Sequence, residues 1–435
     1  MMKKSRKWFP YLLFLAVALV AFTAVIIVNQ SAAPEKEENK SEQQVRDVSS
    51  EKEPNAEETA GENGSPPKEA KVTFFQKESD DEKKVTELIE SMTLEEKIGQ
   101  LLVVGFQSNE VDDHVRKMIS NYHVGGIILY DRNMKTPKQV ASLTNDLQDL
   151  ALKNDHQIPL MITIDQEGGP IVRMKEHVSP LPSQQELGKK GNQTEIYDIA
   201  YRNGKELSAM GIHVNFAPVL DLSATDKRSF GTDPEQAGAF GEQAVKGLTD
   251  ADVTGALKHF PGHGRSQVDP HVETSSVQAD KLDLENKDIY PFKKMINEVD
   301  HNRFFVMVTH IKYPAYDKEN PASISPVIIQ DLLRKKLGYT GIVVTDDLEM
   351  GAVNKYFTYE DLGFKAVESG ADLLLVCHTL ENQQKVFNGI KKAVKANKLS
   401  EDRIDEAVKR ILTYKLHSLK TVHVNPVEAD KLVGK

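Results

Sequence analysis

An apolar run that ends in a cluster of ionisable groups stands in the middle of the chain, Val253-Thr254-Gly255-Ala256-Leu257-Lys258-His259-Phe260-Pro261-Gly262-His263-Gly264. Residues 253–257 have the continuous apolar character of a strand that is buried on both faces. The Pro261-Gly262 pair then ends regular structure. Charged groups at the end of a buried strand are costly unless they bind or react with something. The pattern therefore predicts a buried strand whose carboxyl end carries a functional site.

Further apolar runs of strand length lie on both sides of this one. They are Leu101–Val104, Gly126–Leu129, Leu160–Ile164, Val214–Ala217, Phe304–Val308, Ile342–Val344 and Leu373–Val376. Amphipathic stretches of helical length separate most of them, at 194–210, 235–249, 284–298 and 380–396. Continuous apolar strands that alternate with helices indicate a parallel sheet covered by helices. Eight such units over about 340 residues predict an α/β protein with a (β/α)8 TIM-type barrel as its single catalytic domain.

A doubly wound open sheet is the alternative, but no Gly-x-Gly-x-x-Gly follows the first run, which weakens the dinucleotide-binding version. Two helix starts can be read from capping residues. Thr93-Leu94-Glu95-Glu96 has the form of a capping box. Ser400 precedes an amphipathic stretch at 401–416 and is expected to cap it.

The N-terminal residues 1–34 predict a transmembrane anchor or signal segment. Basic residues at 3–7 precede an uncharged run from Trp8 to Val28, and a helix needs about 20 apolar residues to cross a bilayer. The flanking charges place the N-terminus in the cytoplasm and the rest outside. Signal peptides have shorter apolar cores of about 7–15 residues, which favours a retained anchor. Cleavage near Ser31-Ala32-Ala33 would instead release the protein.

The following segment has the composition of a spacer. Residues 35–70 consist mainly of Glu, Lys, Asn, Ser and Pro and contain no aromatic residue. Such a segment cannot bury enough apolar surface to offset its ordering entropy. We therefore expect a disordered spacer over 35–80, the barrel over 81–420 and a C-terminal tail over 421–435.

Composition excludes some classes of protein. The formal net charge of −10 argues against nucleic acid as a partner. The single cysteine, Cys377, rules out a framework of internal disulfides. It ends the buried-strand pattern 373–376, where a small core thiol is the expected role.

Ionisable residues follow five of the apolar runs. They are Asp165 after the third run, Asp221 after the fourth, Lys258 and His259 after the fifth, His310 after the sixth, and Asp346 and Asp347 after the seventh. In a (β/α)8 barrel the carboxyl ends of all strands meet on one rim, where such enzymes carry their active sites. The sequence therefore predicts that these residues lie together.

An Asp-x-His pair, Asp269-Pro270-His271, follows the fifth run. An aspartate two residues from a histidine on a loop can fix the tautomer of the imidazole and raise its basicity. This arrangement is typical of a general acid/base.

Residues 258–264, followed by Asp269 and His271, resemble the active-site signature of the family 3 glycoside hydrolases, in the β-N-acetylhexosaminidase branch. That signature is Lys-His-Phe-Pro-Gly-His/Asn-Gly, then Asp-Ser-His. Pro270 stands where the family usually has serine. Proline fixes φ and lacks a donor, so the loop that carries the dyad is expected to be stiffer. The resemblance covers about residues 85–420.

Three further segments carry the resemblance. They are Val344-Thr345-Asp346-Asp347-Leu348-Glu349-Met350, Ile164-Asp165-Gln166-Glu167-Gly168-Gly169-Pro170-Ile171-Val172-Arg173, and Phe216-Ala217-Pro218-Val219-Leu220-Asp221 with Arg228-Ser229-Phe230-Gly231. In the first segment the resemblance implies that Asp346 is the nucleophile. On the residues alone, helix-capping acids in a turn are an equally good interpretation of it.

The resemblance also implies a set of substrate contacts. The residues expected to bind sugar hydroxyls are Asp165, Arg173, Arg228, Lys258 and His259. Glu167, Asp221 and His310 are expected to support the site rather than react. His259, His263, Asp269 and His271 are also of the right types for zinc. Lys258 and the proline-glycine turn suit a sugar-hydroxyl clamp better, so we expect no metal and no cofactor.

The function that the resemblance implies is a retaining exo-β-N-acetylglucosaminidase that acts on N-acetylglucosamine-containing glycans, peptidoglycan fragments in particular. Asp346 would attack the anomeric carbon, and His271, oriented by Asp269, would serve as acid and then as base. With the N-terminal anchor, the enzyme is expected on a bacterial cell membrane with its catalytic domain outside. Two alternatives remain open, namely a β-glucosidase of the same fold and a non-catalytic glycan-binding protein on a membrane stalk.

Overall fold

The computed structural model describes residues 72–77, 80–266, 275–419 and 421–435. The predicted N-terminal anchor, most of the predicted spacer and the Asp269-Pro270-His271 motif lie outside the described residues. Within the described ranges, no helix combines the length and the apolar character that crossing a bilayer requires.

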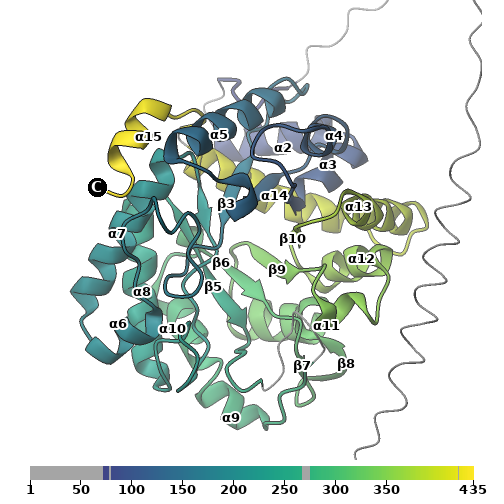
Figure 1. Cartoon of the computed structure of the whole chain (residues 1–435). Coiled ribbons are helices and arrows are strands. Elements are labelled where there is room, and N and C mark those ends of the chain that lie inside the picture. The colour runs from purple at the N-terminus through teal and green to yellow at the C-terminus, as the bar shows by residue number, and fades with distance from the viewer. Residues whose placement is uncertain (1–71, 78–79, 267–274, 420) are drawn as a thin grey trace, which may run out of the picture. The chain divides into compact units, whose positions relative to one another are not determined.

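Parallel strands close into a barrel with helices around it (Figure 1). In order around the barrel the strands are β1 (Leu102–Val104), β10 (Leu373–Val376), β9 (Val343–Asp347), β6 (Phe304–Val308), β5 (Thr254–Phe260), β4 (Val214–Asn215), β3 (Met161–Ile164) and β2 (Gly126–Leu129). Each of these strands coincides with one of the apolar runs. The predicted (β/α)8 barrel is confirmed.

The helices connect and cover the strands. The longer ones are α2 (Asp81–Ser91), α3 (Leu94–Gln100), α4 (Asp113–Tyr122), α5 (Pro137–Ala151), α6 (Gln184–Lys190), α7 (Gln193–Ala209), α8 (Pro234–Asp250), α9 (Lys281–Asn286), α10 (Tyr290–Glu298), η4 (Val327–Lys336), α12 (Tyr359–Ser369), α13 (Leu380–Lys395), α14 (Glu401–Ser418) and α15 (Pro426–Leu432). The short ones are η1 (Asp131–Asn133), η2 (His301–Arg303), η3 (Ala322–Ile324) and α11 (Gly351–Asn354). A two-stranded antiparallel sheet joins β7 (Lys312–Tyr313) to β8 (Asp317–Pro321) after β6.

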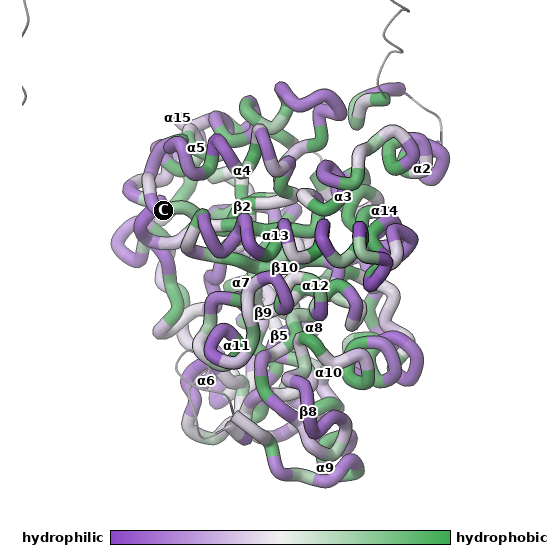
Figure 2. Tube along the Cα trace, turned by 90° about the vertical axis from the view of Figure 1, so that its right-hand side faces the viewer, coloured by the Kyte–Doolittle hydropathy of each residue, from purple (hydrophilic) through white to green (hydrophobic). Residues whose placement is uncertain are grey.

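The barrel strands are buried on both faces, which explains their unbroken apolar sequences. Every residue of β2, β3, β6 and β10 is buried. In Figure 2 hydrophobic colours follow the strands, while hydrophilic colours lie on the outer turns of helices such as α13 and α14. The helix starts follow the capping signals. Thr93 and Glu96 form the reciprocal capping box of α3, and the Ser400 side chain accepts from the Arg403 N–H at the start of α14.

The single helix expected at 284–298 is wrong, because two helices, α9 and α10, occupy this region. Lys287 ends α9 with φ −122° and ψ −81°, which lie outside the helical range. Pro291 stands in the first turn of α10, where the missing N–H of proline costs nothing. The proline is therefore a start signal in a stretch whose apolar spacing alone indicated one helix.

The packed chain extends beyond the predicted limits of 81 and 420. Phe74 is buried, and its N–H donates to the His156 carbonyl oxygen at 2.8 Å. At the other end, α15 contacts α5 and α7, and its Ala429 is fully buried. Phe74 and Ala429 thus each add an apolar side chain to the core. The polar sequences around these two residues did not indicate this packing.

Candidate active site

Residues from several strands converge at the carboxyl end of the barrel. β3 leads to Asp165 and Glu167, β4 leads to Asp221, β5 ends with Lys258 and His259, and β9 ends with Asp346 and Asp347. Because these strands run parallel in one closed barrel, their carboxyl ends meet on one rim, as predicted. Side-chain contacts join Asp165 to Lys258 and Asp221 to His259.

Lys258 and Arg228 are held by two carboxylates. Lys258 Nζ lies 2.7 Å from Asp165 Oδ1 and 2.6 Å from Glu167 Oε1. Arg228 donates to both oxygens of Glu167, at 2.7 Å from Nε and 2.9 Å from an Nη. Burial alone would raise the pKa of Glu167, but the adjacent Lys258 and Arg228 lower it to about 2. Glu167 is therefore ionised and paired, so it fits a supporting role and not that of a proton donor.

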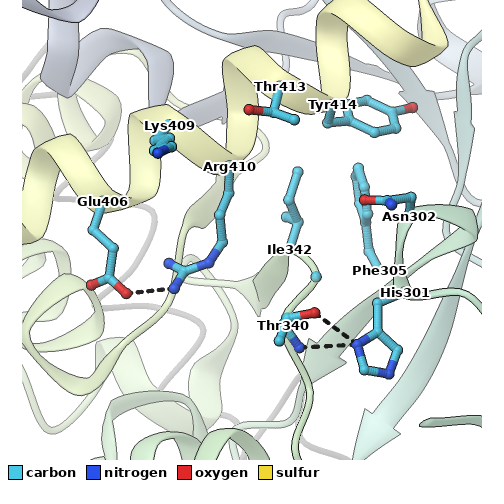
Figure 3. A pocket seen from close by; sticks show the side chains of 11 residues that line it. His301, Asn302, Phe305, Thr340, Ile342, Glu406, Lys409, Arg410, Thr413 and Tyr414 are labelled. Carbon is cyan, nitrogen blue, oxygen red and sulfur yellow. Dashed lines mark hydrogen bonds and ion pairs between the residues drawn. The ribbon is translucent and has the colours of Figure 1, made fainter. Parts of the chain in front are cut away.

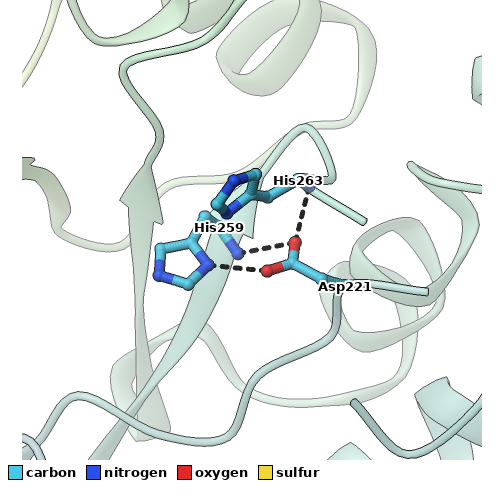
Figure 4. Close-up of side chains that lie close together, drawn as sticks. All are labelled: Asp221, His259 and His263. Carbon is cyan, nitrogen blue, oxygen red and sulfur yellow. Dashed lines mark hydrogen bonds and ion pairs between the residues drawn. The ribbon is translucent and has the colours of Figure 1, made fainter. Parts of the chain in front are cut away.

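A second cluster joins the ends of β4 and β5. Figure 4 shows the Asp221 carboxylate bonded to both His259 and His263. Asp221 Oδ2 is 2.6 Å from His259 Nδ1, and Oδ1 accepts the backbone N–H groups of His259 at 3.1 Å and His263 at 2.6 Å. The carboxylate thereby fixes which ring nitrogen of His259 faces the rim. Nε2 of His259 lies 3.4 Å from an Nη of Arg228.

This cluster holds potential metal ligands, because donor atoms of Asp221, His259 and His263 all lie within 4.8 Å of one another. The carboxylate is already occupied by three hydrogen bonds, one of them from the imidazole that would have to bind the ion. The remaining nitrogen of His259 faces the cationic Arg228. A cation would have to displace these contacts and lie beside a guanidinium. The donor set is therefore better suited to orienting His259 than to binding a metal.

The two adjacent aspartates at the end of β9 differ in their surroundings. Asp347 Oδ1 accepts the N–H groups of Glu349 at 3.1 Å and Cys377 at 3.2 Å. Asp346 accepts the N–H of Asp347 at 2.9 Å. Burial would raise the pKa of Asp346, but His259 and His310 outweigh it and hold that pKa below its ordinary value. Asp346 is therefore an anion beside the histidines, whereas Asp347 is tied to the backbone.

His310 supports this end of β9. Its Nδ1 lies 2.7 Å from Ser323 Oγ, and its Nε2 lies 2.8 Å from the Asp347 carbonyl oxygen. Burial lowers the pKa of His310, although Asp346 acts in the opposite direction. A buried imidazole with both nitrogens engaged positions the backbone next to Asp346.

Arg173 lies in a different sector of the rim from the Lys258 cluster. Its guanidinium is 3.2 Å from Asp131 Oδ2 and lies 5.1 Å from the centre of the Tyr130 ring. Its Nε is buried and has no hydrogen-bonding partner within the part of the chain that the structure describes. A buried donor without a partner is costly, so this atom is suited to receiving a ligand oxygen.

The loop after β5 brings the chain to the boundary of the undescribed segment. Gly262 has φ +123°, and a Cβ there would lie 2.6 Å from the Cβ of Asp288, so this position requires glycine. The Tyr313 hydroxyl donates to the Gly262 carbonyl oxygen at 2.7 Å. Ser266 and Ser275, which flank residues 267–274, are hydrogen-bonded to each other at 2.8 Å.

Of the predicted site residues that the structure describes, Asp165, Lys258, Arg228 and His259 form one network. Two others lie outside this network. Arg173 pairs with Asp131, and the Asp346 carboxylate accepts the N–H of Asp347. The catalytic candidates Asp269 and His271 lie outside the described residues. Two residues at this rim, Tyr130 and His378, were not predicted from the sequence. Tyr130 directly follows β2, and His378 is the second residue after β10, so a search of the residues after every strand would have found them.

A cavity of about 260 Å³ lies at the opposite end of the barrel (Figure 3). It opens between α14 and the amino ends of β6 and β9, and its walls include Phe305, Ile342 and Tyr414. Its charged groups are already paired, with Arg410 bound to Glu406 and Lys409 bound to Glu82. The cluster at the carboxyl ends therefore remains the candidate active site.

A closed parallel barrel with acidic and basic side chains at its carboxyl ends defines the class of (β/α)8 enzymes. Residues 93–414 match the sequence profile described as "Glycosyl hydrolase family 3 N terminal domain". The chain belongs to glycoside hydrolase family 3 and is a glycoside hydrolase.

Individual relatives agree with this assignment. The chain is 33% identical over 302 residues to a "Beta-hexosaminidase" of Hydrogenovibrio crunogenus, a match that covers 66% of this chain and 82% of that protein. It is also 33% identical over 326 residues to the "Beta-hexosaminidase A" of Pseudoalteromonas piscicida, covering 69% of this chain but only 54% of that longer relative.

Solved structures of the family have the same fold. A family 3 β-N-acetylglucosaminidase from Paenibacillus sp. superposes with a TM-score of 0.73 at 38% identity, covering 78% of this chain and 67% of that chain. The β-N-acetylglucosaminidase from Thermotoga maritima gives a TM-score of 0.67 at 27% identity, covering 75% of this chain and 68% of that chain.

Proposed function

We propose that this protein is a retaining exo-β-N-acetylglucosaminidase that acts on N-acetylglucosamine-containing glycans, such as peptidoglycan fragments. The observation that carries the proposal is the ionised Asp346 at the end of β9, which shares the rim with the Lys258–Asp165 pair and Arg228. The names of the β-hexosaminidase relatives and of the β-N-acetylglucosaminidase structures support the choice of sugar.

In the first half of the proposed reaction, the Asp346 carboxylate attacks the anomeric carbon. His271 gives its proton to the glycosidic oxygen, and the leaving saccharide departs. In the second half, His271 takes a proton from water, which attacks the glycosyl–Asp346 ester and releases the sugar with its configuration retained. One group can serve both halves because the pKa of a histidine lies near neutrality.

The substrate-binding residues divide into two groups. Lys258, Asp165, Arg228 and His259 bind sugar hydroxyls on the β3–β5 side of the rim, where Glu167 and Asp221 hold them in place. Arg173 contributes its unpartnered Nε from the neighbouring sector. Asp269 orients His271 from the segment between Ser266 and Ser275. The described loop before this segment carries His263, whose backbone N–H donates to Asp221.

We further propose that residues 8–28 anchor the enzyme in a bacterial cell membrane with the barrel outside. The support is the length of the uncharged run and the basic residues before it. Fractionating the cells and sequencing the N-terminus of the enzyme tests this. Recovery of the enzyme in the membrane supports the anchor. Recovery in the medium with an N-terminus near residue 34 would show that the segment is a cleaved signal.

The activity is tested with para-nitrophenyl glycosides of β-N-acetylglucosamine and β-glucose, each with and without inorganic phosphate. We expect turnover of the first substrate, little turnover of the second and no dependence on phosphate. Preference for the glucoside would make the protein a β-glucosidase. Binding of N-acetylglucosamine oligomers without any turnover would identify a glycan-binding protein instead.

A further inference from the structure

A second carboxylate–imidazole pair lies at the rim, at the ends of β9 and β10. His378 Nε2 is 3.2 Å from Asp347 Oδ2, and Asp347 directly follows the proposed nucleophile in sequence. Neither the proposed mechanism nor the set of sugar-binding residues uses His378. This pair therefore requires an explanation of its own.

The imidazole of His378 is held in one orientation. The Asp347 carboxylate is fixed by the N–H groups that Glu349 and Cys377 donate to its Oδ1. The Tyr130 ring lies against the His378 ring, with centroids 5.4 Å apart. The His378 N–H donates to Glu349 Oε2 at 2.5 Å, which fixes the backbone of this residue. Asp347, Tyr130 and Glu349 thus hold His378 in place. Without these contacts, a side chain at the rim would be free to move.

The second ring nitrogen of His378, Nδ1, is suited to binding a hydroxyl group. With Nε2–H donating to Asp347, neutral His378 presents Nδ1 as a hydrogen-bond acceptor. No described residue pairs with this nitrogen in the structure. Sugar hydroxyls are donors as well as acceptors, so a saccharide fits this edge.

His378 lies nearer the solvent than the residues proposed to bind the sugar hydroxyls and the carboxylate that holds them. Side-chain exposure is 3% for Lys258, 6% for His259 and 2% for Glu167, but 42% for His378. In an exo-acting enzyme the sugar that is cleaved off occupies the deepest part of the site. A side chain nearer the solvent then meets the part of the glycan beyond the scissile bond.

We propose that His378, oriented by Asp347, binds a hydroxyl of the saccharide on the leaving-group side of the scissile bond. This inference rests on the proposed function. It adds a binding site for the leaving saccharide to the same active site. It predicts that His378 matters more for a disaccharide than for an aryl glycoside, whose leaving group carries no sugar hydroxyl.

The test compares kcat/KM for a β-linked N-acetylglucosamine disaccharide with kcat/KM for the para-nitrophenyl glycoside. Loss of one neutral hydrogen bond in His378→Ala should lower the disaccharide-to-aryl ratio about 3- to 10-fold, mainly through KM. His378→Asn keeps a hydrogen-bonding group and should recover part of the loss. The matched control is His423→Ala. His423 is 45% exposed and pairs with Asp149 at 2.8 Å, and its loss should leave the ratio unchanged.

Two results would overturn the inference while leaving the proposed function intact. One is an unchanged ratio in His378→Ala. The other is an equal fall in kcat/KM on both substrates, accompanied by a lower melting temperature, which indicates a structural role only. A wild-type protein that cleaves neither substrate would instead refute the proposed function, and the inference with it.

Discussion

At the scale of single residues, Glu167 determines whether the buried Lys258 and the partly buried Arg228 can remain at the rim. Its carboxylate is the shared partner of Lys258 and Arg228. Among the described residues Asp165 pairs only with Lys258, so the ion pair of Arg228 depends on Glu167. A buried cation that loses its partner costs far more than the pair contributes when intact.

We predict that Glu167→Gln destabilises the protein by about 3–5 kcal/mol, the range measured when one partner of a buried ion pair is removed. The pKa of Glu167 is lowered to about 2 in the folded protein, from an ordinary value of 4.5. Its contribution is therefore fully present above pH 4.5 and is lost as the pH falls from 4.5 towards 2.

Denaturant unfolding of the wild type and of Glu167→Gln at pH 6 and pH 3 measures this contribution. The stability difference between the two proteins should shrink at the lower pH. Glu186→Gln is a control on an exposed carboxylate that caps α6, and its effect should be smaller. A Glu167→Gln protein as stable as the wild type at pH 6 would show that the cations do not need this carboxylate.

At the scale of elements, helix α14 buries an amine, that of Lys415, for which the described residues provide no acidic partner. Lys415 is fully buried, and its Nζ donates to Gln100 Oε1 at 2.8 Å. None of the carboxylates that the structure describes forms an ion pair with it. Burial therefore holds the pKa of Lys415 well below its ordinary value of 10.5.

We predict that stability rises with pH because of Lys415. Below pH 10.5 the unfolded chain protonates this amine, while burial disfavours its protonation in the folded protein. Each pH unit between 8 and 10 should then add up to about 1.4 kcal/mol. Lys415→Met should remove this dependence, whereas Lys409→Met, an exposed position on the same helix, should retain it. Parallel pH dependence in all three proteins would contradict the neutral amine.

The strands could be predicted from the sequence, but some of the other elements could not. Each barrel strand is a continuous apolar run because it is buried on both faces, and that pattern is directly visible. The β7–β8 sheet has no such pattern, since β8 reads Asp317-Lys318-Glu319-Asn320-Pro321 and buries only its last residue. The division between α9 and α10 depended on Pro291, which interrupts an otherwise helical spacing.

The site was predictable in part, for a reason that also lies in the elements. Residues such as Asp165, Lys258 and Asp346 could be selected because each lies at the carboxyl end of a buried strand or directly after it. Their partners could not be predicted, because the contact of Lys258 with Glu167 depends on how β3 and β5 lie around the barrel. Arg173 shows the same limit. The motif that contains it predicted a role, but not its ion pair with Asp131.

At the scale of the whole molecule, the chain enters the barrel at the end opposite the candidate site. The N–H of Phe74 donates to the carbonyl oxygen of His156, and Nδ1 of His156 lies 2.8 Å from the Val72 carbonyl oxygen. His156 lies between α5 and β3, at the amino end of that strand. Residues 72–74 therefore contact the barrel at the end opposite the candidate site.

We predict that a chain beginning at Val72 keeps the kcat/KM of the full-length protein for the aryl substrate within about 2-fold, because surface changes away from the site have small effects. A chain beginning at Asp80 lacks the buried Phe74 and should unfold at lower denaturant concentration, since losing a core phenylalanine costs about 3–5 kcal/mol. A large loss of activity in the Val72 chain, with unchanged stability, would mean that the preceding residues contribute to catalysis.

The central claim is that Asp346 forms a covalent bond with the sugar while His271 moves the protons. It is tested most directly by mass spectrometry of His271→Ala after incubation with the para-nitrophenyl substrate. An activated leaving group needs little protonation, so the first step should proceed, and the second should stall without its base. We predict a glycosyl adduct on the peptide that holds Thr345-Asp346-Asp347, and restored turnover when azide replaces water. An adduct on a different peptide, or no adduct and no rescue by azide, would contradict the account.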